Sequence, residues 1–330
     1  MKIAILIPTL NRIQFIIRTL KYYSQHNLII KVYIGDSSKI NYLETLKKYN
    51  FHTDYKYFHI PGKNDREAIK FLSEKVEEDY VAFSGDDDFL IPDSLIKCAL
   101  FLSKNKSYRT AQGRAYTFSI INNQLYGQIK SIFPYWKKHS ITEEDCIKRA
   151  IEYSKKYFVS QFSVHRSKEY AHDCNRMIDC HNRQLGEFTN CFASIINGKS
   201  KYIDCLHMIR QDHPLRGVSQ ISVGVESNTD FWYKNKKFHN IESFISSVRS
   251  NILENKNISN DNFTFFSNKI IKNLSKRSKD SIFKKYINLF FIYILRLFNT
   301  NHIFNTKYNF YIPKNDIMII RKIYNFLLKE

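Results

Sequence analysis

Glycine, proline and acidic residues are scarce in this sequence. Its 330 residues include 9 glycines, 6 prolines and 31 acidic residues, against 51 lysines and arginines. The loop after the first predicted strand, Pro8–Arg12, contains no glycine. Dinucleotide-dependent enzymes place a G-x-G-x-x-G motif there, and sugar-phosphate nucleotidyltransferases usually begin with a Gly-rich phosphate loop. The absence of glycine argues against both classes of enzyme.

The cysteines lack the spacing of a zinc site or of a disulfide framework. The apolar run after Met1 ends at Pro8, which is too short for a signal peptide, so we expect the chain to stay in the cytoplasm. Reduced thiols are usual there, and we expect all the cysteines to be free. They are scattered without a C-x-x-C pair, at Cys98, Cys146, Cys174, Cys180, Cys191 and Cys205.

No apolar run is long enough to cross a membrane. The most apolar stretch, Ile287–Phe298, is interrupted by Arg296 and is far shorter than the roughly 20 residues that span a bilayer. With Lys284 and Lys285 before it, the stretch has the pattern of a basic amphipathic helix. Such a helix either lies on the inner face of the cell membrane or packs as an ordinary helix on the main domain.

The composition changes along the chain. From Ser243 on, glycine is nearly absent and proline occurs once, while apolar residues recur at helical spacing among many lysines and asparagines. We therefore predict a main domain over residues 1–225 and a basic helical C-terminal region over residues 226–330.

Basic residues give the chain a net charge of +20. A charge of this size calls for a polyanionic neighbour such as nucleic acid, anionic lipid or a phosphate-bearing substrate. A nucleic-acid-binding protein is the non-enzymatic alternative. The basic residues are spread along the whole chain and no nucleic-acid-binding motif is present, so no nucleic-acid partner is expected.

Short β-type apolar runs alternate with segments of helical period in the first third of the chain. This alternation is typical of βαβ units around a mostly parallel sheet. The predicted strands are Lys2–Pro8, Ile30–Gly35, Tyr55–Ile60 and Tyr80–Ser84. The predicted helices are Ile13–Ser24, Tyr42–Tyr49, Arg66–Val76 and Pro92 to about Leu102.

The middle of the chain continues the α/β pattern. We predict strands from Tyr108 to about Lys130 around an Asn122-Asn123 turn, and an amphipathic helix, Thr142–Tyr157, with Thr142 as its N-cap. The later predicted elements are a strand around Val159–His165, a helix around Gly186–Ile196 and a strand near Lys201–Ile209.

Three consecutive carboxylates, Asp86-Asp87-Asp88, directly follow the fourth predicted strand. Parallel strands deliver the loops after them to one edge of the sheet, which is the default ligand crevice. Carboxylates that repel one another at such an edge need a compensating charge, and Mg²⁺ or Mn²⁺ bridges carboxylates to substrate phosphates. The plainer alternative is that these acids only form the turn before the helix at Pro92.

Several motifs together resemble the family-2-like glycosyltransferases with the GT-A fold, across roughly residues 2–215. They are Ile5-Leu6-Ile7-Pro8-Thr9-Leu10-Asn11-Arg12, Asp36, Gly62-Lys63-Asn64 and Phe83-Ser84-Gly85-Asp86-Asp87-Asp88-Phe89-Leu90-Ile91-Pro92. The resemblance implies a Rossmann-like, mixed and mostly parallel sheet with flanking helices, followed by a helical appendage.

The resemblance also implies roles for particular residues. The expected nucleotide-sugar contacts are Thr9, Asn11, Arg12, Asp36, Asp65, Arg66, Asp86 and Arg210, with Asp36 on a base that is typically uracil. Asp86 and Asp88 would form the D-x-D pair that holds Mn²⁺ or Mg²⁺, with His213 as a further ligand. The usual first Asp of that motif falls on Gly85, so Asp87 is the reserve ligand. His213 has an alternative reading as a solvated or capping residue.

The general base comes from the segment Leu185-Gly186-Glu187-Phe188, which resembles the family's Glu-Asp motif at a helix start. Because the second acid is replaced by Phe188, Glu187 is the expected base and Asp179 the fallback. The alternative for Glu187 is a first-turn charge that stabilises the helix dipole.

The sequence thus predicts a metal-dependent glycosyltransferase, with a nucleotide-diphosphate sugar, most typically a UDP-sugar, as donor. The acceptor is expected to be a surface polysaccharide or lipid-linked glycan. One displacement would invert the anomeric centre, and retention stays open. A sugar-phosphate nucleotidyltransferase is the alternative enzyme.

Overall fold

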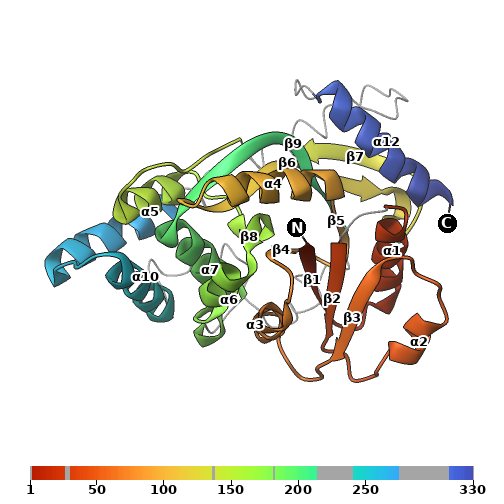
Figure 1. Cartoon of the computed structure of the whole chain (residues 1–330), viewed down its shortest axis with the longest axis horizontal. Coiled ribbons are helices and arrows are strands. Elements are labelled where there is room, and N and C mark those ends of the chain that lie inside the picture. The colour runs from red at the N-terminus through yellow and green to blue at the C-terminus, as the bar shows by residue number, and fades with distance from the viewer. Residues whose placement is uncertain are drawn as a thin grey trace.

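A computed structural model describes residues 2–26, 30–135, 138–180, 183–213, 241–274 and 312–329. These residues form an α/β fold in which helices flank one nine-stranded mixed sheet (Figure 1). The strand order is β3-β2-β1-β4-β8-β6-β9-β5, and β7 pairs with β6 outside this path. A mixed sheet with flanking helices and a helical C-terminal region confirms the predicted fold class.

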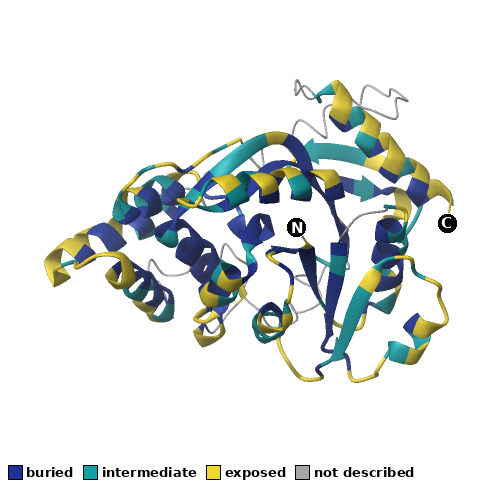
Figure 2. Cartoon of the chain, in the orientation of Figure 1, coloured by how far each residue is buried: buried dark blue, intermediate teal, exposed yellow. Residues whose placement is uncertain are grey.

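Four parallel strands form one half of the sheet. They are β1 (Ile3–Thr9), β2 (Ile30–Asp36), β3 (Asp54–His59) and β4 (Tyr80–Phe83). β1 lies between β2 and β4, and all its residues except Pro8 are buried (Figure 2). A continuous apolar run of this kind is expected of a parallel strand covered on both faces. All four predicted strands are confirmed to within a residue or two at their ends.

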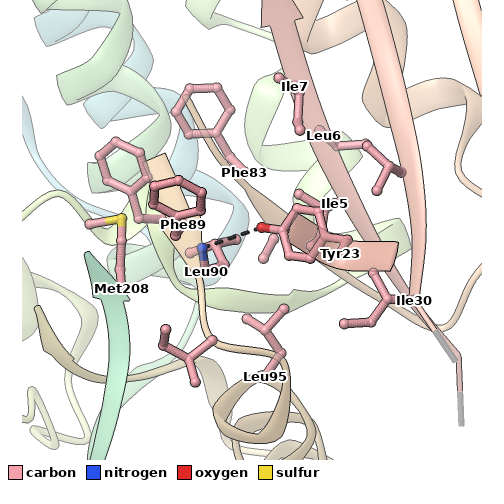
Figure 3. Close-up of a cluster of buried hydrophobic side chains, with 14 of the residues drawn as sticks. Ile5, Leu6, Ile7, Tyr23, Ile30, Phe83, Phe89, Leu90, Leu95 and Met208 are labelled. Atoms are coloured by element: carbon pink, nitrogen blue, oxygen red, sulfur yellow. Dashed lines mark hydrogen bonds between the residues drawn. The ribbon is translucent and has the colours of Figure 1, made fainter. Parts of the chain in front are cut away.

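The helices between and after these strands follow the apolar periodicity closely. They are α1 (Ile13–Ser24), α2 (Leu43–Lys47), α3 (Asp65–Lys75) and α4 (Pro92–Lys104). On α1, Ile16, Leu20 and Tyr23 recur at intervals of four and three and are buried against the sheet. The Tyr23 hydroxyl accepts a hydrogen bond of 3.3 Å from the backbone N–H of Leu90 (Figure 3). α1 is thereby joined to the strand that follows the acidic cluster.

Mostly antiparallel pairings complete the sheet. The strands are β5 (Asp88–Leu90), β6 (Tyr108–Ile120), β7 (Ile129–Pro134), β8 (Val164–Arg166) and β9 (Lys199–Gln211). β8 lies between β4 and β6 and is antiparallel to both, while β6 and β9 are parallel. β5 pairs antiparallel with β9, which places Asp88 opposite Arg210.

Two predictions for the middle of the chain were wrong in detail. The helix expected from Thr142 is α5 (Cys146–Lys155), and its N-cap is Asp145, whose carboxylate accepts from two helical N–H groups. Both residues are good caps, and Asp145 is the one that reaches those groups. The strand expected at Val159–His165 is instead the 3₁₀ turn η2 (Ser160–Phe162) followed by the short β8.

A second hydrophobic cluster lies beside the sheet and consists of helices. It includes α5, α7 (Arg183–Asn197), α10 (Glu242–Asn255) and the helix over residues 260–274. α7 begins three residues before the predicted helix, so Glu187 lies beyond its first residues. The short elements α6 (Ser167–Cys174) and η3 (Met177–Asp179) precede α7.

The last described helix, α12 (Lys314–Lys329), packs on the sheet core. Ile320, Ile323 and Phe326 belong to the same core cluster as β1 and α1. At its N-terminal end the buried Asp316 accepts bidentate hydrogen bonds from Arg114 of β6, at 2.5 and 2.8 Å. An ion pair and an apolar face together fix α12 to the main sheet.

The structure tests some of the remaining predictions, which concern the cysteines, membrane-spanning segments and the domain boundary. All six cysteines are free, as predicted, and the structure shows that all six are buried. None of the described helices is both long and apolar enough to cross a bilayer. The stretch Ile287–Phe298 and the predicted boundary at residue 225 lie outside the described residues.

We predict that Asp316→Asn lowers the free energy of unfolding by about 3–5 kcal/mol, because it leaves the Arg114 guanidinium buried without its main counter-charge. Urea titration followed by circular dichroism measures the change. Asp204, whose side chain is 76% exposed, also contacts Arg114 and is the matched control. Asp204→Asn should cost less than about 1 kcal/mol. Equal effects of the two variants would contradict the anchoring role of Asp316.

Candidate active site

Three buried carboxylates form the centre of the candidate site. β4 ends at Phe83, and the chain turns through Gly85 so that Asp86, Asp87 and Asp88 are 4%, 5% and 0% exposed. A Cβ at Gly85 would lie 2.8 Å from Asp87 Oδ1, so a larger residue there would displace the Asp87 carboxylate. Buried carboxylates are costly unless cations and hydrogen bonds compensate them. The surrounding elements must therefore supply positive charge.

Arg12, at the N-cap of α1, supplies the first positive charge. Its guanidinium bridges two acids, with Nη1 2.8 Å from Asp86 Oδ1 and Nη2 2.9 Å from Asp87 Oδ2. The Thr9 hydroxyl donates to the other Asp86 oxygen at 2.7 Å. The loop after β1, which the sequence predicted to line the donor, thus contacts the acidic loop after β4.

The end of β9 supplies the second and third partners. His213 Nε2 lies 3.0 Å from Asp87 Oδ2 and 3.2 Å from Arg12 Nη2. Because Arg12 can only donate, a proton on His213 Nε2 that points at Asp87 satisfies the closer contact. Arg210 Nε donates to Asp88 Oδ2 at 3.1 Å, across the β5–β9 pair.

The two acids bridged by Arg12 differ in their affinity for protons. Burial and the neighbouring Asp87 charge raise the pKa of Asp86 to about 7. Burial would also raise the pKa of Asp87, but hydrogen bonds and charge from His213 and Arg12 outweigh it and lower that pKa. Asp87 is therefore the carboxylate held in the ionised form.

One face of α1 supports the acidic loop from behind, and the sequence reading did not identify it. Arg18 is fully buried and donates to the Asp87 carbonyl at 3.0 Å and to Gln211 Oε1 at 2.6 Å. The Thr19 hydroxyl donates to the Asp86 carbonyl at 2.9 Å. The Phe15 ring stacks on His213 at 5.2 Å and lies 4.1 Å from the Arg12 guanidinium carbon. Their spacing along the chain, at 12, 15, 18 and 19, was the available signal.

Burial lowers the pKa of Arg18 to about 10, although the Asp87 and Asp86 charges oppose the shift. At neutral pH the side chain therefore remains a cation behind the acidic loop. One guanidinium nitrogen of Arg18 donates to Asp87 and the other donates to Gln211, which lies two positions before His213. Arg18 therefore contacts both segments that supply the Asp87–His213 pair. Arg18 thus sets the relative position of β9 and the acidic loop.

The end of β2 forms a second polar cluster, around Asp36. Asp36 Oδ1 accepts from the Ser38 backbone N–H at 2.9 Å and from its hydroxyl at 2.5 Å, and Oδ2 accepts from the Tyr57 hydroxyl at 2.7 Å. The same Ser38 hydroxyl accepts from the N–H of Asn11, which has a left-handed φ of 56°. Asp36 and Asn11, both predicted donor contacts, are therefore linked through Ser38.

The N-termini of α3 and α7 meet at the next side of the site. Asp65 forms an ion pair of 2.9 Å with Arg183 of α7. The aliphatic part of Arg66 lies against Gly186, where a Cβ would come within 2.2 Å of Arg66 Cδ. Asn64 caps α3 through a capping box with Glu67, which fixes this helix start. The predicted donor residues Asp65 and Arg66 thus contact the helix that carries Glu187.

Glu187 accepts a hydrogen bond of 2.7 Å from the Tyr157 hydroxyl. Burial raises the pKa of Glu187, while Tyr157, Arg183 and Arg210 oppose the increase. The charge of Arg210 opposes the increase in the pKa of Glu187, and the charge of Glu187 raises the pKa of Arg210, so the two side chains lie within electrostatic range of each other.

The fallback base lies elsewhere. Asp179 lines a polar cavity of about 240 Å³ together with His172, Asp173 and Glu254. Among the described residues, no hydrogen bond or ion pair joins Asp179 to Arg12, His213 or the acidic loop.

Asp87 Oδ2 and His213 Nε2 are atoms that could bind a divalent cation. Carboxylate oxygen and imidazole nitrogen are both ligands that Mn²⁺ accepts, and an ion at His213 Nε2, 3.0 Å from Asp87 Oδ2, would take the place of the proton on that nitrogen. In the part of the chain that the structure describes, no group of three or more His, Cys, Asp and Glu side chains could hold a metal. A pair suffices where substrate phosphates supply the remaining ligands. Asp88, also predicted as a ligand, forms an ion pair with Arg210.

Comparisons with known proteins give a family model and a set of solved structures that match this chain. The family model described as Glycosyl transferase family 2 matches residues 4–180, more than half of the chain. The crystal structure of S. aureus TarS matches with 15% identity and a TM-score of 0.47, over 84% of this chain and 55% of TarS. This chain thus spans about half the length of TarS. No curated protein matches the sequence.

Two further crystal structures contain residues 1–349 of S. aureus TarS. The complex with UDP is 15% identical, with a TM-score of 0.47 over 86% of this chain and 92% of that chain. The complex with UDP-GlcNAc is 14% identical, with a TM-score of 0.46 over the same shares.

We predict that Arg18→Met lowers the free energy of unfolding by about 3 kcal/mol or more, because it leaves buried acceptors at Asp87, Gln211 and Leu125 without their donor. Urea titration measures the loss. Arg18→Lys restores the charge with fewer donors, and it should recover part of the stability. A variant as stable as the parent would show that these three hydrogen bonds contribute nothing.

Proposed function

The chain belongs to glycosyl transferase family 2 and is a glycosyltransferase, and we propose that it moves a sugar from a UDP-sugar to a hydroxyl of a surface polysaccharide or lipid-linked glycan. One observation carries the proposal. Residues from distant parts of the sequence meet beside the carboxyl ends of β1 and β4, at the contacts of Asp86 and Asp87 with Thr9, Arg12 and His213. This edge is where an α/β sheet binds its ligand.

The nucleotide is proposed to bind along the ends of β1, β2 and α3. Asp36 would accept hydrogen bonds from the uracil, since its carboxylate oxygens retain further lone pairs beside Ser38 and Tyr57. Thr9 and Arg12 would line the phosphates. Asp65 and Arg66, at the capped start of α3, would close the other side of the pocket.

A divalent cation, Mn²⁺ or Mg²⁺, is proposed to sit between the acidic loop and the donor diphosphate. The 3.0 Å contact supports Asp87 and His213 as its protein ligands, and Asp86 and Asp88 flank them. When bound, it would neutralise the charge that develops on the departing diphosphate. Arg210 would add a fixed cation on the same side, because its contact with Asp88 holds the guanidinium in place.

Glu187 is the proposed general base. Its raised pKa brings the carboxylate closer to the operating pH, as general bases require. Phe188, which replaces the family's second acid, packs among Tyr157 and Phe244 in the helical cluster. A single base and one displacement support inversion at the anomeric carbon.

The acceptor is proposed to be presented near an anionic membrane surface. The outer face of α12 carries the exposed basic residues Lys314, Arg321, Lys322 and Lys329, beside the exposed Met318 and Leu328. The acidic residue described on this helix, Asp316, is buried against Arg114. Such a basic face suits contact with anionic headgroups on the cytoplasmic leaflet.

We predict that Glu187→Gln reduces sugar transfer by about 10²–10⁴-fold, because the amide cannot accept the acceptor's proton. Donor affinity should stay unchanged, since Glu187 acts on the acceptor. Transfer from a panel of nucleotide sugars, followed by release of nucleotide diphosphate, measures the first quantity, and calorimetry with UDP measures the second. Asp179→Asn is the matched control and should retain transfer. Loss of activity in Asp179→Asn alone would move the base to that residue.

A second prediction concerns pH. Transfer requires unprotonated Glu187, so the rate falls as the pH drops through the raised pKa of this residue. The Tyr157 hydrogen bond lowers that pKa, so Tyr157→Phe should raise it further and move the acid limb of kcat/KM to higher pH. Tyr153→Phe removes a hydroxyl from the ring that neighbours Tyr157 at 5.2 Å, and should leave the limb in place. If the acid limb does not shift in Tyr157→Phe, a group other than Glu187 is responsible for it.

A further inference from the structure

The guanidinium of Arg12 occupies the space between the three side chains that would surround a cation. It contacts Asp86 at 2.8 Å, Asp87 at 2.9 Å and His213 at 3.2 Å. The Arg12 side chain is 8% exposed and that of His213 is 1% exposed, so the arrangement is shielded from water. A cation already fills the position.

Other guanidinium groups also surround the acidic loop. Arg12 pairs with the Asp86 and Asp87 carboxylates and Arg210 with Asp88, while the Arg18 guanidinium donates to the Asp87 carbonyl. A divalent ion that approached Asp87 and His213 with Arg12 in place would meet a like charge at contact distance. The ion must therefore displace Arg12, and the displaced guanidinium then needs another anion.

We propose that Arg12 keeps the metal position closed until a nucleoside diphosphate binds, so that the cation and the nucleotide enter the site together. The inference rests on the proposed function. A diphosphate supplies both missing parts, because its oxygens bind Arg12 in bidentate fashion and complete the coordination of the ion.

Two features of Arg12 support this exchange. Its Nε is buried and has no hydrogen-bond partner among the described residues, so the present arrangement leaves one donor unused. Arg12 also follows Asn11, whose φ is 56°, and forms the N-cap of α1 with φ −135° and ψ 40°. The side chain therefore leaves the backbone at the junction of loop and helix, beside the predicted phosphate position.

The expected consequence is reciprocal coupling between metal and nucleotide. UDP should tighten Mn²⁺ binding about tenfold or more, and Mn²⁺ should tighten UDP binding by the same factor. Electron paramagnetic resonance of free Mn²⁺ measures the first affinity, and calorimetry with UDP in EDTA or in Mn²⁺ measures the second. Mn²⁺ alone should bind more tightly to Arg12→Gln than to the parent. The coupling factor, which is the factor by which UDP tightens Mn²⁺ binding, should fall toward one in this variant.

Two variants complete the experiment. Arg249→Gln removes one charge from α10, outside the site, and should behave like the parent. Arg12→Lys keeps the charge but cannot bridge two acids, so its coupling factor should lie between those of parent and Arg12→Gln. Circular dichroism checks that each variant folds. If Arg12→Gln does not fold, the effect of UDP on Mn²⁺ affinity in the parent protein still tests the inference.

The outcomes separate the inference from the function. Mn²⁺ that binds the parent equally well with and without UDP would overturn the role of Arg12 and leave the donor site standing. Unchanged Mn²⁺ affinity in folded Arg12→Gln would do the same. Failure of UDP to bind in either medium would overturn the proposed donor, and the inference with it.

Discussion

The need to neutralise three buried carboxylates determines much of this architecture. Asp86, Asp87 and Asp88 lie where water can compensate little of their charge, so the fold must bring guanidinium groups to them. Arg12 comes from the loop after β1 and Arg210 from β9, two segments far apart in the sequence. The acidic loop therefore holds together the parallel and the antiparallel halves of the sheet, and its own geometry depends on both.

α1 shows how one helix serves the core and the site together. Its apolar positions, among them Ile16 and Leu20, pack against the sheet, whereas Phe15, Arg18 and Thr19 support the acidic loop. A shift of this helix along its axis would move the core contacts and the site contacts by the same amount. Packing density in the core thus limits how far the polar side can relax, which gives the site a rigid support.

The sequence predicted the regular elements better than the polar contacts, for physical reasons. Periodicity depends on many residues at once, and it located α1 at its observed bounds, Ile13–Ser24. A cap depends on one side chain, and Thr142 and Asp145 are both suitable, so the choice rests on tertiary geometry. A buried Arg18 cannot be distinguished from an exposed one by pattern alone. The proximity of Asp87 to His213 spans 126 positions, and local chemistry contains no information about it.

Arg210 connects the two chemical roles proposed for the site. Burial lowers its pKa, but the charges of Asp88, Tyr135, Asp87 and Glu187 outweigh that effect and raise it, so the guanidinium stays charged. The same cation stabilises the ionised form of Glu187 and holds Asp88 at the end of the acidic loop. During transfer, negative charge would leave Glu187 as it takes up a proton and would grow on the diphosphate. A fixed cation that interacts with both groups would favour both states, because it would lose one anionic partner as it gained the other.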